Sequence, residues 1–253
     1  MPTNLLAGYK SASQMARVSS EAWGEQSLYC ASCDASSLER CVPNMKSIDF
    51  ICEQCKLPYQ LKSSTARLHT RVTDGAYATM KKTIESGQAP NLLLLQYDLA
   101  SWMVRNLTVV PWFAVTLSCL ECRPVLMPPA RRAGWQGCNI LLRNMPPDVR
   151  VPMVVDGQAR AARDVRRDFA KLTPVAKFSA LQRGWTLDVL NVVRGISKKR
   201  FSLRDVCNHS PQLQRLHPEN RHVEAKIRQQ LQILRDMGIL NFLDNRGNYE
   251  VID

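Results

Sequence analysis

Apolar runs and amphipathic segments alternate through the first two thirds of this chain. Two bounded apolar runs are consistent with buried strands, Leu92–Tyr97 and Leu107–Val115. Two further strands are predicted at Cys138–Leu142 and Val151–Val155. Two segments have helical character, Ser11–Gln26 and Ala76–Gly87, the second with Asp74 as a candidate N-cap and Gly87 as its stop. Because strands and helices intermix, we expect an α/β or α+β fold.

From about Gly184 onward the pattern changes to that of a winged helix-turn-helix. Its predicted elements follow in order: a helix at Leu187–Gly195, an extended piece at Arg200–Ser202, a helix at Leu203–Asn208, a loop with Pro211 and Pro218, a long helix at His222–Met237 and a hairpin over Ile239–Ile252. The hairpin turn, Asp244–Asn248, is rich in residues that tolerate positive φ. The sequence therefore predicts two domains, residues 1–183 and residues 184–253.

One pair of cysteines precedes a predicted hairpin near the N-terminus, and a second pair lies within it. Its short strands, Ile48–Ile51 and Tyr59–Lys62, are joined by a tight turn that contains the second pair. Eighteen residues separate the two Cys-x-x-Cys pairs, which are Cys30, Cys33, Cys52 and Cys55. Each short turn brings two sulfurs onto one ion, so the four thiolates can close a tetrahedral zinc shell. A lone pair, Cys119 and Cys122, has an apolar context and is expected to be buried packing.

The same hairpin carries a candidate nuclease centre. Gln60 and Lys62 lie two residues apart, so their side chains point to one face of the strand, and Asp49 on the partner strand can project to that face too. Oxygens of Asp49 and Gln60 could hold Mg²⁺, while Lys62 could orient an attacking water or balance charge on a phosphate. Taken alone the pattern is weak, and its ordinary alternative is a lysine on an exposed polar strand face.

Composition indicates a globular protein. Hydrophobic residues make up 45% of the 253 and charged residues 22%, and no apolar run approaches the roughly 20 residues of a membrane span. The N-terminus lacks a basic stretch followed by an apolar core, so we expect a cytoplasmic protein with no membrane partner. In that compartment the nine cysteines are expected to bind metal or to be buried rather than to form disulfides.

The charge of the chain is strongly basic and unevenly spread. The formal net charge is +12, and residues 123–183 hold 12 basic against 4 acidic side chains. Eight arginines concentrate the excess: Arg131, Arg132, Arg143, Arg150, Arg160, Arg163, Arg166 and Arg167. Neutralising phosphates releases counterions, so this excess favours a nucleic-acid partner over a solvated basic surface without one.

The chain resembles the Dam-replacing family of methyl-directed type II restriction endonucleases over nearly its whole length. The segments that carry the resemblance are the two cysteine pairs, Ile48–Cys52, Gln60–Ser63, Asp74–Met80, Ala130–Ile140 and Lys226–Asp236. The resemblance implies a PD-(D/E)xK restriction-endonuclease-like domain with an embedded four-cysteine zinc site, followed by a winged-helix domain. It also implies Mg²⁺-dependent cleavage of double-stranded DNA at GATC sites that contain N6-methyladenine, by a chain that we expect to be a monomer.

This chain departs from the family centre at one position. The family has glutamate two residues before the lysine, whereas this chain has Gln60, and a neutral amide binds Mg²⁺ less strongly than a carboxylate. Glu21 or Glu25, on the first predicted helix, could assist. Two alternatives to the endonuclease therefore stay open: a protein that binds methylated DNA but cuts it weakly or not at all, and a structural or regulatory protein with charge-driven DNA binding only.

Two segments are predicted to contact DNA. Arg131 and Arg132 can anchor phosphates or recognise guanine, and Trp135 offers a flat surface for the adenine methyl groups, with a core tryptophan as the alternative. In the long helix, four apolar residues form the core face: Val223, Ile227, Leu231 and Leu234. The N-terminus of such a helix normally enters the major groove. We expect His222 and Gln229 to touch bases there, and Arg221, Lys226 and Arg228 to favour phosphates.

Overall fold

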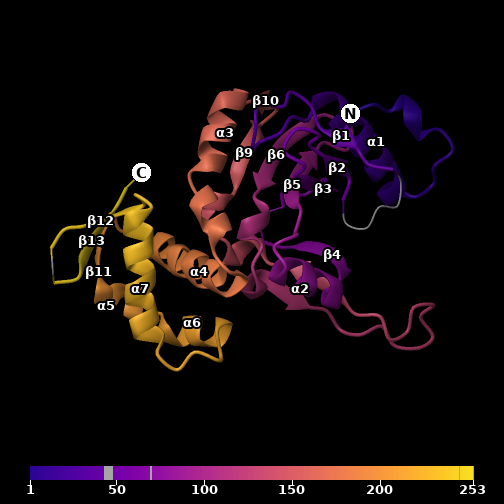
Figure 1. Ribbon diagram of the computed structural model, residues 1–253. Coiled ribbons are helices and arrows are strands. Elements are labelled where there is room, and N and C mark those ends of the chain that lie inside the picture. The colour runs from indigo at the N-terminus through magenta and orange to yellow at the C-terminus, as the bar shows by residue number, and fades with distance from the viewer. Residues whose placement is uncertain (43–47, 69, 245, 253) are drawn as a thin grey trace.

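A mixed sheet of seven strands forms the framework of the first two thirds of the molecule (Figure 1). The computed structural model describes residues 1–42, 48–68, 70–244 and 246–252. In order across the sheet the strands are β1 (Glu39–Arg40), β2 (Phe50–Ile51), β3 (Pro58–Ser64), β5 (Asn91–Tyr97), β6 (Val104–Val110), β9 (Val151–Val155) and β10 (Gln158–Ala159). Strands β3 and β5 run parallel, and the other neighbouring pairs are antiparallel.

Strand β5 is the buried centre of this sheet. Leu92, Leu93, Leu94 and Leu95 are each at most 4% exposed, so both faces of the strand are covered, as its continuous apolar run predicts. Its register with β3 sets Gln60 opposite Leu92 and Lys62 opposite Leu94. The candidate residues of β3 therefore lie on a strand whose backbone is paired with the buried strand β5.

One helix packs near each edge of the sheet. Helix α1 (Ala12–Ser27) contacts β3, and α3 (Ala162–Ala170) contacts β9 (Figure 1). Gly24 allows α1 to lie close to the hairpin, because a Cβ at this position would lie 2.6 Å from Cζ of Phe50. The predicted N-terminal helix is confirmed, displaced by one residue at each end.

A second, smaller sheet adjoins the first. It has the order β4 (Val72–Ala76), β8 (Gly137–Ile140), β7 (Leu120–Cys122), and α2 (Tyr77–Glu85) follows β4 directly. The expectation for Asp74 was wrong: Asp74 lies within β4, and Ala76 occupies the N-cap position of α2. Gly87 does end the helix region, with a φ of +71°.

Two predicted strands are shorter than expected because the backbone turns. Leu107–Val115 ends as a strand at Val110, since Pro111 introduces the 3₁₀ turn η2 (Trp112–Ala114). Cys138–Leu142 ends at Ile140 and passes into η4 (Leu142–Asn144). The remaining short turns are η1 (Asn4–Leu6), η3 (Leu117–Cys119), η5 (Pro147–Val149) and η6 (Thr173–Lys177).

The last third of the chain forms helices followed by a wing. Its elements are α4 (Ala180–Ile196), β11 (Arg200–Ser202), α5 (Leu203–Cys207), α6 (Ser210–Leu216), α7 (Val223–Asp236), β12 (Leu240–Phe242) and β13 (Asn248–Val251), with the sheet order β11-β13-β12. The predicted proline loop was wrong in part, since Pro211 stands in the first turn of α6, where its missing N–H costs nothing. Asn245 of the predicted wing turn lies outside the described residues.

Helix α4 connects the two parts of the molecule (Figure 1). It begins at Ala180, so the predicted division at residue 183 falls inside this helix. Gly184 lies within it because the helix passes close to His217, whose Cε1 would lie 3.3 Å from an added Cβ. The buried carboxylate of Asp188 accepts a hydrogen bond from Ser118 of η3 (2.8 Å) and lies 2.7 Å from Nε2 of His217. The contact between the two parts is thus polar as well as apolar.

A further ion pair joins α4 to the first part. Arg194 donates from Nε to both carboxylate oxygens of Asp148, at 3.0 and 2.9 Å, and from Nη2 to the same group. None of the helices in the described part of the chain combines the length and the apolar character that crossing a bilayer requires.

Candidate functional site

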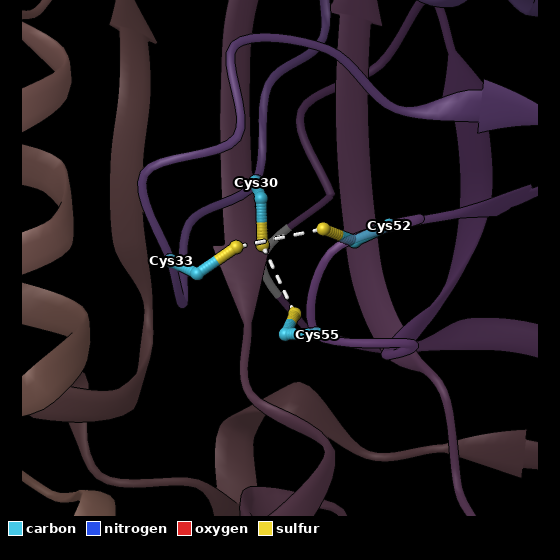
Figure 2. A group of neighbouring side chains, drawn as sticks. All are labelled: Cys30, Cys33, Cys52 and Cys55. Atoms are coloured by element: carbon cyan, nitrogen blue, oxygen red, sulfur yellow. Dashed lines mark hydrogen bonds between the residues drawn. The ribbon is translucent and has the colours of Figure 1, made fainter.

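The structure gathers the sulfurs of the four-cysteine cluster, Cys30, Cys33, Cys52 and Cys55, around one point (Figure 2). All four sulfurs lie within 4.8 Å of one another, with separations of 3.6 Å for Cys30–Cys55 and 3.5 Å for Cys33–Cys52. Sulfurs about 2.3 Å from one tetrahedral zinc ion would lie roughly 3.8 Å apart. The cluster therefore fits a zinc ion, and these four residues would hold it.

The surroundings of the cluster lower the pKa of one thiol, that of Cys52, and hold the sulfur of Cys30 in place. Although burial opposes it, hydrogen bonds, led by the one from the Cys55 backbone amide, lower the pKa of the Cys52 thiol to about 7. The Tyr59 hydroxyl accepts a hydrogen bond from the Ala31 amide (3.2 Å), which leaves its proton for Cys30 Sγ, also 3.2 Å away. Burial raises the pKa of Tyr59, so that proton is retained. Such second partners orient metal ligands.

An arginine of α3 binds the backbone of the loop that carries Cys30 and Cys33. Arg166 donates from Nε to the carbonyl of Cys30 (3.1 Å) and from Nη2 to the carbonyl of Ala35 (2.9 Å). The side chain is thus occupied in the fold. Arg160 is likewise held, by the carbonyl of Pro152 (2.9 Å) and the carboxylate of Asp168 (2.8 Å). Part of the basic excess of residues 123–183 therefore serves internal contacts.

The predicted nuclease residues lie together beside the hairpin. Asp49, Gln60 and Lys62 line a common cavity of about 520 Å³. The Asp49 amide donates to the carbonyl of Tyr59 (2.9 Å), which continues the pairing of β2 with β3, and Oδ2 of Asp49 accepts from the Leu61 amide (2.7 Å). Burial raises the pKa of Asp49, an effect that the Leu61 amide and the charge of Lys62 counter only in part.

A further carboxylate, which the sequence did not indicate as functional, stands in this centre. Oδ1 of Asp74 accepts hydrogen bonds from Nζ of Lys62 (2.8 Å), Nε2 of Gln60 (3.3 Å) and its neighbour's amide, that of Gly75 (2.8 Å). The prediction that Gln60 and Lys62 point to one face is confirmed by their common partner. Asp74 belongs to β4, in the other sheet, so the spacing along the chain gave no sign of the contact.

Two oxygens of this centre have no hydrogen-bond partner among the described residues. They are Oε1 of Gln60 and Oδ2 of Asp74, and both are buried. Leaving a buried acceptor without a partner costs about 1–3 kcal/mol, and more when the group is charged. Carboxylate and amide oxygens are suitable ligands for Mg²⁺, so the centre fits this ion on the chemistry of its free acceptors.

The two glutamates expected to assist Gln60 have arginine partners. Glu21 lines the same cavity, but its carboxylate lies 2.5 Å from Arg40 and 3.6 Å from Arg17. Glu25 is not among the residues that line this cavity; its side chain is 58% exposed and lies 4.0 Å from Arg40. Glu21 therefore contributes negative charge near Asp49, whereas the carboxylate bonded to Gln60 is that of Asp74.

Trp135 stands half-buried beside a second cavity. The cavity has a volume of about 410 Å³, and its lining includes Gly75, Ala76, Arg132 and Trp135. Cζ of Arg132 lies 4.6 Å from the centroid of the Trp135 ring, and a Cβ on Gly137 would lie 2.6 Å from that ring. Arg131 and Arg132 are both exposed. The predicted group is thus brought together, on the β7–β8 loop that projects from the body of the molecule (Figure 1).

Helix α7 presents its predicted polar face to the outside. Its four expected core residues are all buried: Val223, Ile227, Leu231 and Leu234. The side chains of Arg221, His222, Arg228 and Gln229 are exposed. Lys226 is half-buried and donates to Oε1 of Gln229 at 2.8 Å. Near the start of the helix, Arg221 and His222 line a surface hollow of about 490 Å³ together with the first residues of α6. This exposed start of the helix is the part that enters the major groove of DNA in helix-turn-helix proteins.

Comparison with protein families accounts for both parts of the chain. The model of the DpnI family, described as the Dam-replacing family, matches residues 1–178. The model described as the Dam-replacing HTH domain matches residues 181–251. Together the two matches cover nearly the whole chain, in agreement with the mixed α/β part, the four-cysteine cluster and the helices with a wing. The chain belongs to the Dam-replacing family.

Proposed function

We propose that this protein is a methyl-directed type II restriction endonuclease that hydrolyses double-stranded DNA at GATC sites containing N6-methyladenine, with Mg²⁺ as its catalytic cofactor. Membership of the Dam-replacing family supports the reaction class and the type of site. The observation that carries the proposal is the centre in which Asp49, Gln60 and Lys62 line one cavity and two buried oxygens have no partner in the part of the chain that the structure describes.

Each residue of the centre has a part in this reaction. Asp49 and Gln60 would hold Mg²⁺, which when bound neutralises charge on the phosphate and lowers the pKa of its water. Lys62, with 20% of its side chain exposed, reaches the cavity from β3 and orients the attacking water or the phosphate oxygens. The four cysteines act at a distance, since zinc bound there fixes the hairpin from which the centre projects.

The two predicted DNA-contacting segments would share recognition. The exposed Arg131 and Arg132 fit phosphates or guanine edges, and the half-buried Trp135 offers an apolar face to the methyl group. On α7, His222 and Gln229 would meet base edges, while Arg221, Lys226 and Arg228 would favour the backbone.

One observation favours a second candidate function. Gln60 is neutral where the family centre is acidic, so the protein could recognise methylated GATC while cutting it weakly or not at all. Duplexes with and without N6-methyladenine in GATC, incubated with and without Mg²⁺, separate the two functions. The endonuclease cuts only the methylated duplex and only with Mg²⁺. Selective binding without cleavage at any Mg²⁺ concentration would establish the second function instead.

Substitutions in the centre should remove cleavage and spare DNA binding. Asp49→Asn keeps an acceptor for the Leu61 amide, and Lys62→Gln keeps a long polar side chain. Each is expected to lower the cleavage rate by roughly 10²-fold or more, because positioned charge and proton-transfer groups contribute at least that much. Lys10→Gln, at an exposed position, is the matched control. Full activity in either centre variant would contradict these roles.

A further inference from the structure

The charge of the proposed Mg²⁺ site is incomplete if Asp49 and Gln60 alone form it. One carboxylate and one amide supply a single negative charge, and the amide is the weaker ligand for a hard cation. Gln60 has lost the charge but has kept its place: it is only 6% exposed and lies among the buried residues of β3. A second carboxylate in contact with Gln60 would supply the missing negative charge.

Asp74 is the acidic group that meets this requirement. Its side chain is 2% exposed, and Oδ1 is bonded to both Gln60 and Lys62. Oδ2 carries no hydrogen bond from any described residue, and the same holds for Oε1 of Gln60. Hydrogen bonds to Oδ1 hold the carboxylate in place, and the second oxygen remains available.

A buried carboxylate of this kind calls for a cation. Lys62 offsets its charge through Oδ1, at 2.8 Å, but a buried Oδ2 without a donor from the described residues is unfavourable. Asp74 and Gln60 could each contribute this free oxygen to a divalent ion, which would give both acceptors a partner. With Asp49 it would then have two carboxylates and one amide, a normal oxygen-ligand set.

We propose that Asp74, reaching in from β4, supplies to the catalytic metal the carboxylate that position 60 lacks. The inference rests on the proposed function and adds a ligand to it. Lys62, whose Nζ donates to Oδ1 of Asp74, would then lie at the edge of the metal site. Asp74, in the neighbouring sheet, would thereby supply the negative charge that a glutamate at position 60 of β3 would supply.

Metal binding without DNA tests this assignment directly. The probe is Mn²⁺, measured by electron paramagnetic resonance titration of the full-length protein and of the Asp74→Asn variant. Asparagine has the same shape and keeps an acceptor for Lys62, so the expected effect is at least a tenfold weaker binding of Mn²⁺. Asp156→Asn, an exposed turn residue with a φ of +48° that asparagine tolerates, is the matched control. Unchanged affinity in Asp74→Asn would overturn the assignment.

A second test moves the negative charge from position 74 to position 60. The double variant Gln60→Glu with Asp74→Asn keeps the number of carboxylates and places the acid where the family centre has it. It should bind Mn²⁺ at least fivefold more tightly than Asp74→Asn alone, and it should recover cleavage of methylated duplex. Thermal unfolding without added Mn²⁺ or Mg²⁺ is recorded for each variant to compare their folds. A double variant that binds Mn²⁺ no better than Asp74→Asn contradicts a role as ligand.

Failure of the inference and failure of the proposed function give different results. If the natural protein cuts methylated duplex and Asp49→Asn loses Mn²⁺ while Asp74→Asn retains it, the function stands and the inference falls. If the natural protein binds Mn²⁺ with the dependence on Asp74 described above but leaves methylated duplex intact at all Mg²⁺ concentrations, the inference stands and the proposed function falls.

Discussion

At the scale of single residues, Gly137 decides where Trp135 lies. The ring passes so close to this glycine that an added Cβ would lie 2.6 and 2.8 Å from two of its carbons. Because Gly137 is buried within β8 and paired with Ala76, the backbone has little freedom to move away. The tryptophan is thus seated on a strand of the small sheet, although it belongs to a projecting loop.

Displacing Trp135 should reduce discrimination between methylated and unmethylated sites. Trp135→Ala removes the apolar face, and Gly137→Ala moves it by steric conflict, so both should lower the ratio of cleavage rates on the two duplexes by roughly tenfold or more, as loss of one good base contact does. The ratio is measured at saturating Mg²⁺. Leu126→Ala, on the same loop and partly exposed, is the control. An unchanged ratio in Trp135→Ala would mean that methyl recognition lies elsewhere.

Most of the candidate centre could be predicted from the sequence, and its missing member could not. The period of two along a strand placed Gln60 and Lys62 on one face, and the hairpin placed Asp49 beside them. Asp74 was interpreted as a helix cap because it precedes a helical segment. Its contact with Lys62 arises where two sheets meet, and packing between sheets has no period along the chain.

At the scale of elements, the β2–β3 hairpin links the four-cysteine cluster to the candidate centre. Cys52 follows β2 directly, and its amide donates to the carbonyl of Leu57, which closes the turn before β3. Tyr59 is fully buried and contacts Cys30 through its hydroxyl, while the next residue on the strand is Gln60. One strand thus joins the two proposed metal sites.

Removing the Tyr59 hydroxyl should loosen zinc without removing a ligand. Tyr59→Phe loses the contacts with Cys30 Sγ and the Ala31 amide, and loss of such second partners typically lowers metal affinity by 10–100-fold. The measurement is the rate and extent of zinc transfer to a colorimetric chelator. Tyr249→Phe, in the wing, serves as the control tyrosine. Equal zinc retention in Tyr59→Phe and the natural protein would show that the hydroxyl is not needed.

Stripping zinc should abolish cleavage even when Mg²⁺ is restored. Four buried or half-buried thiols within 4.8 Å of one another repel as thiolates without a cation, and the hairpin that bears Asp49 depends on their turn. We expect a lower melting temperature after chelation and recovery of both fold and cleavage when Zn²⁺ is returned. Cleavage by the zinc-free protein at the natural rate would contradict the structural role of the ion.

The elements that the sequence predicts well are those fixed by local pattern. Strand β5, helix α1 and the core face of α7 follow from apolar runs and helical spacing. Helix α6 was missed because Pro211 was interpreted as a loop residue rather than as the first turn of a helix. The start of α4 was missed because Gly184 suggested a break, whereas this glycine lies inside the helix, where the His217 ring approaches closely.

At the scale of the whole molecule, α4 fastens the winged part to the first part. Its buried Asp188 holds Ser118 on one side and His217 on the other, and the His217 ring stacks on Trp185 with centroids 4.0 Å apart. Burial raises the pKa of Asp188, and the hydrogen bond from His217 counters that effect. Both parts would thus approach DNA in a defined relation.

Weakening this junction should destabilise the whole molecule. Asp188→Asn keeps one acceptor oxygen and replaces the other by an amide NH₂, which cannot accept a hydrogen bond from Ser118 or His217, so we expect a cost of about 1–3 kcal/mol. For a chain of this size each kcal/mol lowers the melting temperature by roughly 2–4 °C. Calorimetry of Asp188→Asn beside Asp156→Asn measures the difference. Identical melting of the two variants would contradict a stabilising role for the junction.

Strand β4 is shared by the two cavities. Val72 and Thr73 line the one that holds Asp49 and Lys62, and Gly75 and Ala76 line the one that holds Trp135; the pairing with β8 shifts register at the point between them. A base that contacted the second cavity would therefore lie next to the backbone segment that carries Asp74. Under the proposed function, we expect the methyl mark to change mainly the rate of cleavage and to a smaller extent the strength of binding, so that unmarked DNA would be bound almost as tightly but left uncut.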